Sequence, residues 1–318
     1  MNKIAIIESI HEEGINLLKK HPNFKYEIIT DVSEENLIKT LPDFDGCTLR
    51  ISRLSSTVLS KCKKLKVISR HGVGYDNVDL DYIKQNNIKL MITATANATA
   101  VSEHVMYMML NLSKSKLLYD NEVRLGNFKK NIKDIQTFEL MNKEILIAGF
   151  GRIGKSLIKK CIGFDMQVKV FDPYVSNNEV KSYGGVKIDN FNNGLKTLDF
   201  LSLHVPLNSK TKNLINTNNL CTMKKNAIII NTSRGGVVNE KDLNSALDNN
   251  QIYAAGLDVF EKEPPDLNHP LIKNKKVLLT PHVSALTNEC KIRMAKETVN
   301  NIIDFFENNP NPSMIGNL

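Results

Sequence analysis

The sequence has no tryptophan, few aromatic residues and no long apolar run. Aromatic residues make up 6% of the 318 residues, yet hydrophobic residues still account for 42% and charged residues for 24%. This balance is typical of a folded globular chain rather than a disordered one. No stretch approaches the roughly 18 consecutive apolar residues that a membrane-spanning helix needs. We therefore expect a folded protein that does not span a membrane, and the length favours two domains over one.

Cysteine is scarce and widely spaced. The five cysteines form no C-x-x-C pair, so neither a disulfide framework nor a zinc site is expected, and no cluster has the spacing of metal ligands. The apolar run near the N-terminus is too short for a signal peptide, and acidic residues follow it at once. We expect reduced thiols, a cytoplasmic location and no bound metal.

Positive charge is in excess, but it is not concentrated. The formal net charge is +8, and the lysines are scattered and often stand beside asparagine. No arginine-rich segment interleaved with aromatic residues is present, so nucleic-acid binding is not expected. An excess of positive charge favours an anionic substrate.

Short apolar runs alternate with helical patterns along the first part of the chain. The expected strands cover residues 3–8, 25–30, 46–51, 65–70 and 88–93. Strands that alternate with helices predict an α/β fold with a parallel sheet and helices on both of its faces.

A long helical pattern over residues 99–126 separates this part from a second alternation. The strands expected there cover residues 145–150, 167–172, 198–205, 227–231, 252–259 and 276–280. The last helical pattern, at 288–309, can return to the first sheet. We therefore predict two doubly wound parallel-sheet domains: a discontinuous outer domain (1–98 and 289–318) and an inserted domain (99–288).

The segment "GFGRIG" carries the most specific local signal. Gly149, Gly151 and Gly154 follow a predicted strand and open a predicted helix, and the next strand ends on Asp172. This is the pattern of a dinucleotide-binding turn, in which glycines allow a tight turn and a close approach to the pyrophosphate. An acid at the end of the second strand accepts hydrogen bonds from ribose hydroxyls and disfavours a 2′-phosphate, so the pattern predicts NAD rather than NADP.

Four polar residues lie at or beyond the ends of later predicted strands. Arg234 comes after "AIIINTS", Asp258 and Glu263 lie in "LDVFEKEPP", and His282 follows "KVLLTP". Ligands of open α/β sheets bind beyond the carboxyl ends of the strands. A cation, a proton donor and a carboxylate that tunes the donor are what hydride transfer to a keto acid requires.

Several segments together resemble the D-2-hydroxyacid dehydrogenases over nearly the whole chain. They are "GVGYDNVD", "ANATAVSEH", "GFGRIG", "HVPLNSKTKNLI", "NTSRGGVVNE", "GLDVFEKEP" and "TPHVSALT". The resemblance implies a flavodoxin-like substrate-binding outer domain, an inserted Rossmann domain that binds NAD, and a homodimer formed through residues 99–143. It also implies that Arg234 binds the substrate carboxylate and keto oxygen, that His282 is the general acid/base, and that Glu263 is its hydrogen-bonded partner.

The resemblance extends to the residues that contact cofactor and substrate. Those expected at the cofactor are Gly149, Gly151, Arg152, Ile153, Gly154, Asp172, Val205, Pro206, Thr211, Thr232, Ser233, Asp258 and Ala285. The backbone of Val73 and Gly74 is expected at the substrate carboxylate. Arg50 and Arg53, with Arg70 as a further candidate, are expected to read a second anionic group.

The substrate is not fixed by these motifs. Within the family, the sequence is most similar to short 3-phosphoglycerate dehydrogenases, and hydroxypyruvate or glyoxylate reductase and a sulfolactate-type dehydrogenase are the alternatives. The chain departs from many members at Val283, Ser284 and Ala285, and at Phe128, where many have tryptophan. A hypothesis of another class is an NAD-sensing binding protein on the same fold. Formate dehydrogenases pair the acid/base histidine with glutamine, which distinguishes them from a chain with Glu263.

Overall fold

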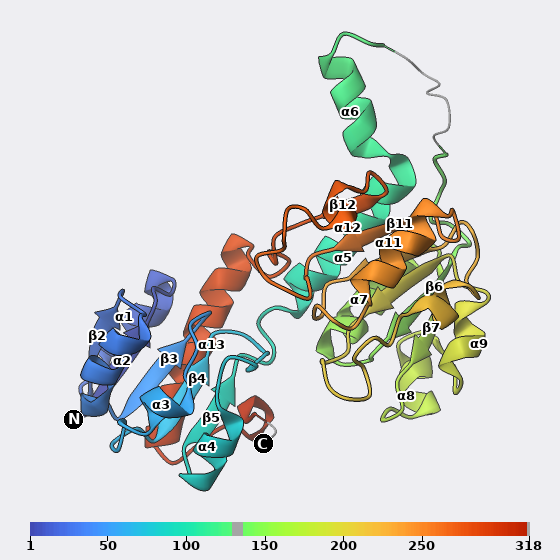
Figure 1. The fold of residues 1–318 in the computed structure, drawn as a ribbon. Coiled ribbons are helices and arrows are strands. Elements are labelled where there is room, and N and C mark those ends of the chain that lie inside the picture. Colours follow the sequence, from blue (N-terminus) through green and yellow to red (C-terminus); the bar gives the residue numbers. More distant parts are fainter. Residues whose placement is uncertain (129–135, 317–318) are drawn as a thin grey trace. The chain divides into compact units, whose positions relative to one another are not determined.

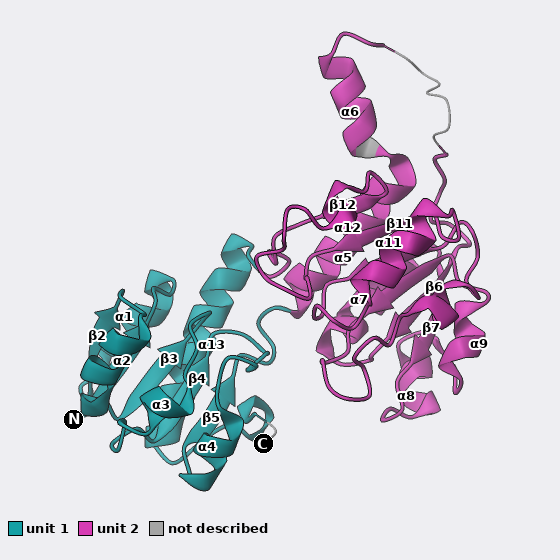
Figure 2. Ribbon diagram, in the orientation of Figure 1, with its two compact units in different colours: residues 1–97, 286–318 teal, residues 98–285 magenta. Residues whose placement is uncertain are grey.

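The computed structural model describes residues 1–128 and 136–316. The chain divides into two compact units, which Figure 2 colours separately. Unit 1 combines residues 1–97 with 286–318, and unit 2 comprises residues 98–285. These divisions lie within a few residues of the boundaries expected from the sequence. The chain thus leaves unit 1 after its fifth strand and returns to it for one long helix.

Unit 1 is built on a parallel sheet. Its described strands are β1 (Asn2–Ile7), β2 (Phe24–Ile29), β3 (Gly46–Leu49), β4 (Val67–Arg70) and β5 (Lys89–Ile92). They stand in the order β2-β1-β3-β4-β5, and neighbouring strands run parallel. This is the strand order of flavodoxin-like doubly wound sheets, so the predicted fold class is confirmed for this unit.

Helices cover both faces of this sheet. They are α1 (Glu12–Lys20), α2 (Glu34–Thr40), α3 (Ser56–Leu59), α4 (Leu80–Gln85) and α13 (Asn288–Phe306), with 3-10 turns η1 (Leu41–Asp43) and η2 (Pro312–Met314). Because side chains alternate along a strand, Ala5 and Ile7 enter one core while Ile4 and Ile6 enter the other, where Val299 of α13 packs. The last helix therefore completes one face of the first sheet (Figure 1).

Unit 2 contains a larger parallel sheet. Its described strands are β6 (Glu144–Ala148), β7 (Gln167–Phe171), β8 (Val186–Lys187), β9 (Phe200–Leu203), β10 (Ile228–Asn231), β11 (Ala254–Leu257) and β12 (Val277–Leu279). They stand in the order β12-β11-β10-β9-β6-β7-β8, which is the Rossmann order with one further strand at the edge. The predicted Rossmann fold is confirmed. The two-residue strand β8 was not expected from the sequence.

The helices of unit 2 lie between these strands. They are α5 (Ala98–Lys114), α6 (Lys116–Arg124), α7 (Arg152–Gly163), α8 (Asn177–Ser182), α9 (Phe191–Leu195), α10 (Thr217–Leu220), α11 (Glu240–Asp248) and α12 (Pro270–Lys273). The fully buried Val105, Met108 and Met109 pack α5 against Ile228 and Ile230 of β10. This contact attaches α5 to the sheet whose strand ends carry the candidate residues.

The expectation of one continuous helix over 99–126 is wrong. Ser115 adopts a left-handed backbone conformation (φ +48°), which ends α5 and starts α6 on a new axis, because a right-handed helix cannot continue through such a residue. The region 99–143, expected to form a dimer contact, includes residues 129–135, which lie outside the described residues. The homodimer stays a prediction.

Candidate active site

The strand register of unit 2 brings the predicted site residues to one edge of the sheet. Ala148, the last residue of β6, pairs with the last residues of β7 and β9, and Asn231 of β10 pairs with the last residues of β9 and β11. β11 and β12 also end together, at Leu257 and Leu279. The segments that follow these strands therefore emerge side by side, which is where ligands of doubly wound sheets bind.

The three glycines of the turn between β6 and α7 have different physical roles. Gly149 has a φ of +95°, and a Cβ atom there would lie 2.5 Å from the carbonyl oxygen of His204. A Cβ at Gly154 would lie 2.4 Å from the carbonyl oxygen of Gly149, so this glycine lets α7 pack closely on the turn. A Cβ at Gly151 would meet no protein atom within 4 Å. The turn is therefore packed tightly on its inner side and open at Gly151.

This open side fits a dinucleotide. Gly151 is the N-cap of α7 and has no side chain with which to cap the helix, so no side-chain cap competes with a phosphate at this helix end. The predicted phosphate contacts of the Arg152 and Ile153 N–H groups stay predictions. Thr232, at the end of β10, is 7% exposed, and its hydroxyl has no hydrogen-bond partner in the described structure. A buried unpaired hydroxyl indicates a missing polar partner, as expected of a residue predicted to contact the cofactor.

Asp172 lies directly beside the glycine turn. Its carboxylate accepts hydrogen bonds from the backbone N–H groups of Phe150 (2.7 Å) and Tyr174 (2.8 Å). Val205 also reaches the turn, since its Cγ1 lies 3.2 Å from the Cβ position of Gly149. The ends of β6, β7 and β9 thus bring together three of the residues predicted at the cofactor.

The loop after β9 has its own internal support. The Thr211 hydroxyl accepts a hydrogen bond from the Asn208 N–H (2.9 Å) and donates to the carbonyl of Pro206. Thr211 therefore shapes the loop that begins with Val205 and Pro206. Its predicted contact with the cofactor stays a prediction.

Arg234 stands in a turn built by the end of β10. The Asn231 side chain donates to the Arg234 carbonyl (2.9 Å) and accepts from the N–H and the hydroxyl of Ser233. Gly235 brings the next loop against this turn, because a Cβ there would lie 1.8 Å from the carbonyl oxygen of Phe260. Only glycine permits this contact, which connects the segment carrying Arg234 to the segment carrying Glu263.

His282 and Glu263 form a hydrogen-bonded ion pair. The imidazole Nδ1 lies 2.8 Å from the Glu263 Oε2, and the Phe260 N–H donates to the other carboxylate oxygen at 3.1 Å. The hydrogen bond to Glu263 raises the pKa of His282 above its ordinary value, although burial acts against this shift. Burial favours neutral Glu263, but the hydrogen bonds from His282 and Phe260 outweigh it and lower the pKa of that carboxyl.

The pair is accessible and lies within the field of Arg234. The His282 side chain is 50% exposed and the Glu263 side chain 38% exposed in the structure of this chain, so the imidazole Nε2 edge can meet a substrate. The positive charge of Arg234 acts on both groups: it lowers the pKa of Glu263 and works against the rise at His282. A cation, an imidazole and its carboxylate partner are therefore close enough to influence one another.

Asp258 differs from the other predicted site residues because its side chain is fully buried. Its carboxylate accepts hydrogen bonds from the Thr280 hydroxyl (2.6 Å) and from the N–H groups of Val283 (2.8 Å) and Ser284 (3.0 Å). These bonds hold the loop between His282 and Ala285. Cofactor contacts by Asp258 and Ala285 stay predictions.

In unit 1, polar groups also collect beyond the strand ends. The Arg50 guanidinium donates to the carbonyl of Ser9 (3.0 Å), whereas Arg70 donates to the carbonyls of Gly74 (2.7 Å) and Leu49 (2.7 Å). Arg70 therefore holds the loop that contains Val73 and Gly74. Arg53 is exposed, and Val73 is 36% exposed. Both residues are thus accessible, and the roles predicted for Arg53 and for the Val73 backbone stay predictions.

Sequence reasoning assigned His104 to helix packing and did not single out Thr280. In the structure the His104 Nε2 lies 3.1 Å from the Thr280 hydroxyl, next to Asp258. One signal was present in the sequence, since a histidine interrupts the apolar positions of the helix at 98–114.

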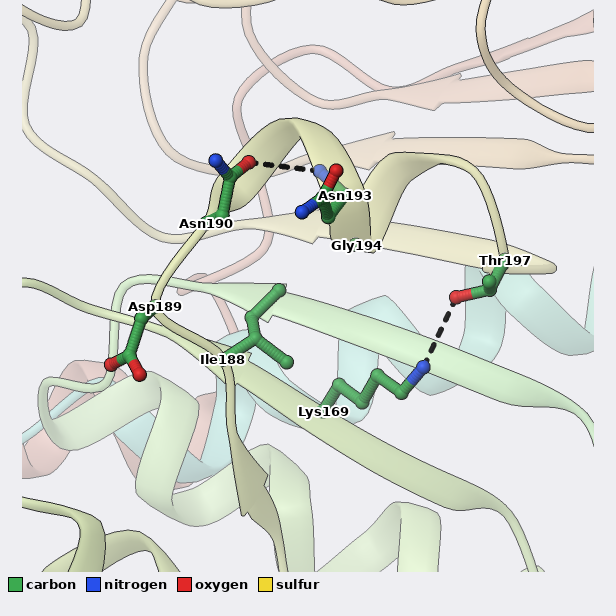
Figure 3. Close-up of a pocket in the computed structure, with 7 residues that line it drawn as sticks. All are labelled: Lys169, Ile188, Asp189, Asn190, Asn193, Gly194 and Thr197. Carbon is green, nitrogen blue, oxygen red and sulfur yellow. Dashed lines mark hydrogen bonds between the residues drawn. The ribbon is translucent and has the colours of Figure 1, made fainter.

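Two surface hollows of unit 2 lie away from these residues. The first, drawn in Figure 3, has a volume of about 380 Å³ and is lined by Lys169, Ile188, Asp189, Asn190, Asn193, Gly194 and Thr197. Its Lys169 is already bound to Thr197 and Glu144. The second, of about 490 Å³, lies between the junction of α5 with α6 and the starts of β11 and β12. Neither contains a residue predicted at the site.

The glycine turn, Asp172 and the strand order define a dinucleotide-binding Rossmann domain. Residues 106–284 match the family model described as D-isomer specific 2-hydroxyacid dehydrogenase, NAD binding domain. A D-3-phosphoglycerate dehydrogenase from Methanocaldococcus jannaschii is 35% identical over 92% of this chain, and a hydroxypyruvate reductase from Thermotoga maritima is 33% identical over 94%. The chain belongs to the D-isomer specific 2-hydroxyacid dehydrogenase family.

The relatives differ in length. The chain matches 55% of the Methanocaldococcus protein and 97% of the Thermotoga protein. A crystal structure of D-lactate dehydrogenase from Aquifex aeolicus, complexed with NAD and lactic acid, is 27% identical in sequence and has a TM-score of 0.84. The match covers 96% of this chain and 96% of the Aquifex chain.

The described residues offer neither a cluster of metal ligands nor a membrane-spanning helix. No group of three or more histidine, cysteine, aspartate or glutamate side chains is placed to hold a metal ion. Among the helices that are described, none combines the length and apolarity needed to span a membrane.

Proposed function

We propose that this chain catalyses reversible hydride transfer between NAD(H) and an anionic 2-hydroxy acid or 2-keto acid. The observation that carries the proposal is the His282–Glu263 pair, joined at 2.8 Å at the carboxyl edge of a sheet whose other strand ends form a dinucleotide turn. Unit 2 supplies the cofactor site in this proposal, and unit 1 binds the substrate.

Each residue has a defined task. NAD, when bound, accepts or supplies the hydride. Arg234 binds the substrate carboxylate with its planar guanidinium and stabilises the negative charge that develops on the keto oxygen during reduction. Protonated His282 delivers a proton to that oxygen, and neutral His282 removes it in the oxidation. Glu263 holds the ring and favours the imidazolium form.

Asp172 supports NAD as the cofactor. Its carboxylate is fixed beside the turn by two backbone N–H groups, in the place where ribose hydroxyls bind in this fold. A 2′-phosphate at this position would meet a negative charge, so NADP is disfavoured.

For the substrate we propose 3-phosphoglycerate, with hydroxypyruvate or glyoxylate as the second candidate. A phosphate needs a further cation, and Arg50 and Arg53 follow β3 at the edge of unit 1 where ligands of such sheets bind. The Thermotoga relative, a hydroxypyruvate reductase covered over 97% of its length, favours the second candidate.

A panel of 2-keto and 2-hydroxy acids, followed by NADH absorbance, tests the proposal. Phosphoglycerate and D-lactate are compared in the native protein and in Arg50→Ala and Arg53→Ala. If one arginine binds the phosphate, its loss lowers kcat/KM far more for phosphoglycerate than for lactate. Equal losses for both substrates, or no phosphoglycerate activity, would refute the proposed substrate. The proposed dehydrogenase activity itself would not be refuted by either result.

Two variants test the catalytic roles. His282→Ala is expected to lower turnover by about 10²–10⁴, the usual contribution of general acid–base catalysis, with little change in NAD affinity. Arg234→Lys retains the charge but loses the planar two-pronged donor, so binding and rate should both fall. A turnover of His282→Ala equal to that of the native protein would show that His282 is not the acid/base.

A further inference from the structure

A chain of hydrogen bonds runs from α5 to the loop that carries His282. The His104 Nε2 lies 3.1 Å from the Thr280 Oγ1, and that hydroxyl lies 2.6 Å from the Asp258 Oδ1. Asp258 is fully buried, and the His104 side chain is 16% exposed. All three residues belong to unit 2.

The direction of these hydrogen bonds follows from the number of protons available. A threonine hydroxyl has a single proton, and the Asp258 carboxylate, which accepts from Val283 and Ser284 as well, takes it. The Thr280 oxygen must then accept from His104, whose Nε2 carries the proton. Burial lowers the pKa of His104, so this histidine is neutral at neutral pH with its proton on Nε2.

The series of hydrogen bonds from His104 leads to a strained part of the backbone, at His282. His282 has a φ of +55°, a left-handed conformation that costs free energy for any residue other than glycine. The two N–H groups that follow it, on Val283 and Ser284, are held by Asp258, and its own N–H donates to the Thr280 carbonyl (3.1 Å). Thr280 therefore contacts this loop directly through its backbone carbonyl, and its side chain binds the Asp258 carboxylate that holds the loop.

We propose that His104 and Thr280 are positioning residues that orient Asp258 and thereby hold His282 in register with Glu263. The inference rests on the proposed role of His282 as the acid/base. The charged groups that act on His282 are Glu263, Asp258 and Arg234, and the hydrogen bond to Glu263 has the largest effect on its pKa. If the loop loses its anchor, this bond weakens and the pKa of His282 falls toward its ordinary value.

The test uses variants of the full chain that remove or keep one donor. Thr280→Val and His104→Leu each interrupt the series of hydrogen bonds from His104 to Asp258. Thr280→Ser keeps the hydroxyl, and His104→Gln keeps a side-chain N–H donor. We expect the first two to lower kcat by about tenfold to a hundredfold, the scale of a small misplacement of a catalytic group. Thr280→Ser and His104→Gln should recover most of that loss. The double variant His104→Leu/Thr280→Val should be no worse than the poorer single variant, since both act through one chain.

Two readouts separate positioning from general damage. The first is the pKa of His282, measured from its ring resonance by NMR and assigned by its absence in His282→Gln. The second is the pH limit of NADH-dependent reduction, measured together with the dissociation constant of NADH. Both the pKa and the pH limit should move down in the chain-breaking variants, with NADH affinity nearly unchanged.

The outcomes are distinct. An unchanged or raised pKa of His282 in Thr280→Val and His104→Leu would overturn the positioning role, because Asp258 would then act on an undisplaced histidine. A lowered pKa without any change in the pH–rate profile would support positioning but reject His282 as the acid/base. If Thr280→Val does not fold, the comparison of His104→Leu with His104→Gln decides the same question.

Discussion

Two carboxylates near the proposed acid/base have opposite surroundings. Glu263 is 38% exposed and is bound to the His282 ring, whereas Asp258 is fully buried and bound to backbone N–H groups and a hydroxyl. The same functional group therefore serves in one place to favour a charge on a neighbouring ring and in the other to fix a loop. Their surroundings, rather than their residue types, separate the two roles.

Replacing Glu263 with glutamine should move the pH dependence of the reaction. The pKa of His282 is raised mainly by its hydrogen bond to Glu263, so loss of the negative charge lowers that pKa. Reduction needs the protonated ring and should lose activity at a lower pH than in the native protein, while oxidation should extend to lower pH. The pH profiles of kcat/KM in both directions measure this shift. Superimposable profiles for Glu263→Gln and the native chain would contradict the pairing.

Replacing Asp172 with serine should lower kcat/KM with NADH relative to kcat/KM with NADPH. The change removes the carboxylate that repels a 2′-phosphate, and it also removes acceptors for Phe150 and Tyr174, so some loss with both cofactors is expected. The measured quantity is the ratio of kcat/KM for NADH and NADPH. Asp189→Ser, at a carboxylate that is 95% exposed, is the control and should leave the ratio unchanged. A native chain that already uses both cofactors equally would refute the role of Asp172.

At the scale of elements, hydrophobic alternation was sufficient for most of the fold. Runs such as residues 227–230 are apolar because parallel strands are buried on both faces, and β10 covers most of this run. Two features left no comparable signal. The break at Ser115 has neither glycine nor proline beside it, and the strand β8 is only two residues long. Both depend on tertiary packing that local periodicity does not contain.

The site divides in the same way. The glycine spacing and the positions of Asp172, Arg234 and His282 after predicted strands are visible in the sequence. The glycines predict the tight turn after β6, and the positions after strands predict the carboxyl edge of the sheet. The link from His104 to Thr280 joins residues 176 positions apart. No spacing rule connects them, so this contact becomes visible only when α5 is placed on the sheet.

The glycine turn offers a matched pair of variants. In Gly154→Ala the new methyl group would meet the Gly149 carbonyl oxygen, so we expect a loss of about 1–3 kcal/mol of stability, as for other overpacked sites. In Gly151→Ala the methyl group has space within the protein, and the loss should stay within about 1 kcal/mol, the scale of a helix cap.

Cofactor binding should separate the same two variants. Gly151→Ala should weaken NADH binding strongly, because the methyl group occupies the side that approaches the pyrophosphate. Urea titrations and NADH fluorescence measure the two effects. Tight NADH binding by Gly151→Ala would show that the phosphates do not lie there.

For the whole molecule, each unit contains a partly buried histidine whose pKa is strongly lowered. Burial lowers the pKa of His71 in unit 1 to about 4, with Arg50 and Arg70 adding to the effect, and burial alone lowers the pKa of His204 in unit 2 to about 4. The unfolded chain binds these protons near the ordinary value of 6.5. The stability that these two histidines contribute is therefore fully present above about pH 6.5 and is lost as the pH falls toward 4, by on the order of 2–3 kcal/mol for each histidine.

Urea unfolding at several pH values measures this loss. The midpoint should fall between pH 7 and pH 5 in the native chain, and less steeply in His71→Gln and His204→Gln. His11→Gln, at a partly exposed histidine that caps α1, is the control and should keep the native slope. Equal acid sensitivity in all four proteins would show that neither His71 nor His204 is responsible.

The return of the chain to unit 1 has a consequence for how the molecule is made. A ribosome completes β1 to β5 and then all of unit 2 before it reaches α13, whose Ala295 and Val299 cover the sheet face that carries Ile4 and Ile6. Until that moment the nascent first sheet exposes an apolar face, while unit 2 already has every strand and helix that it needs. The inserted unit can therefore fold on the ribosome first. The strands β1 to β5 are made earliest, but their sheet is completed only when α13 has been synthesised.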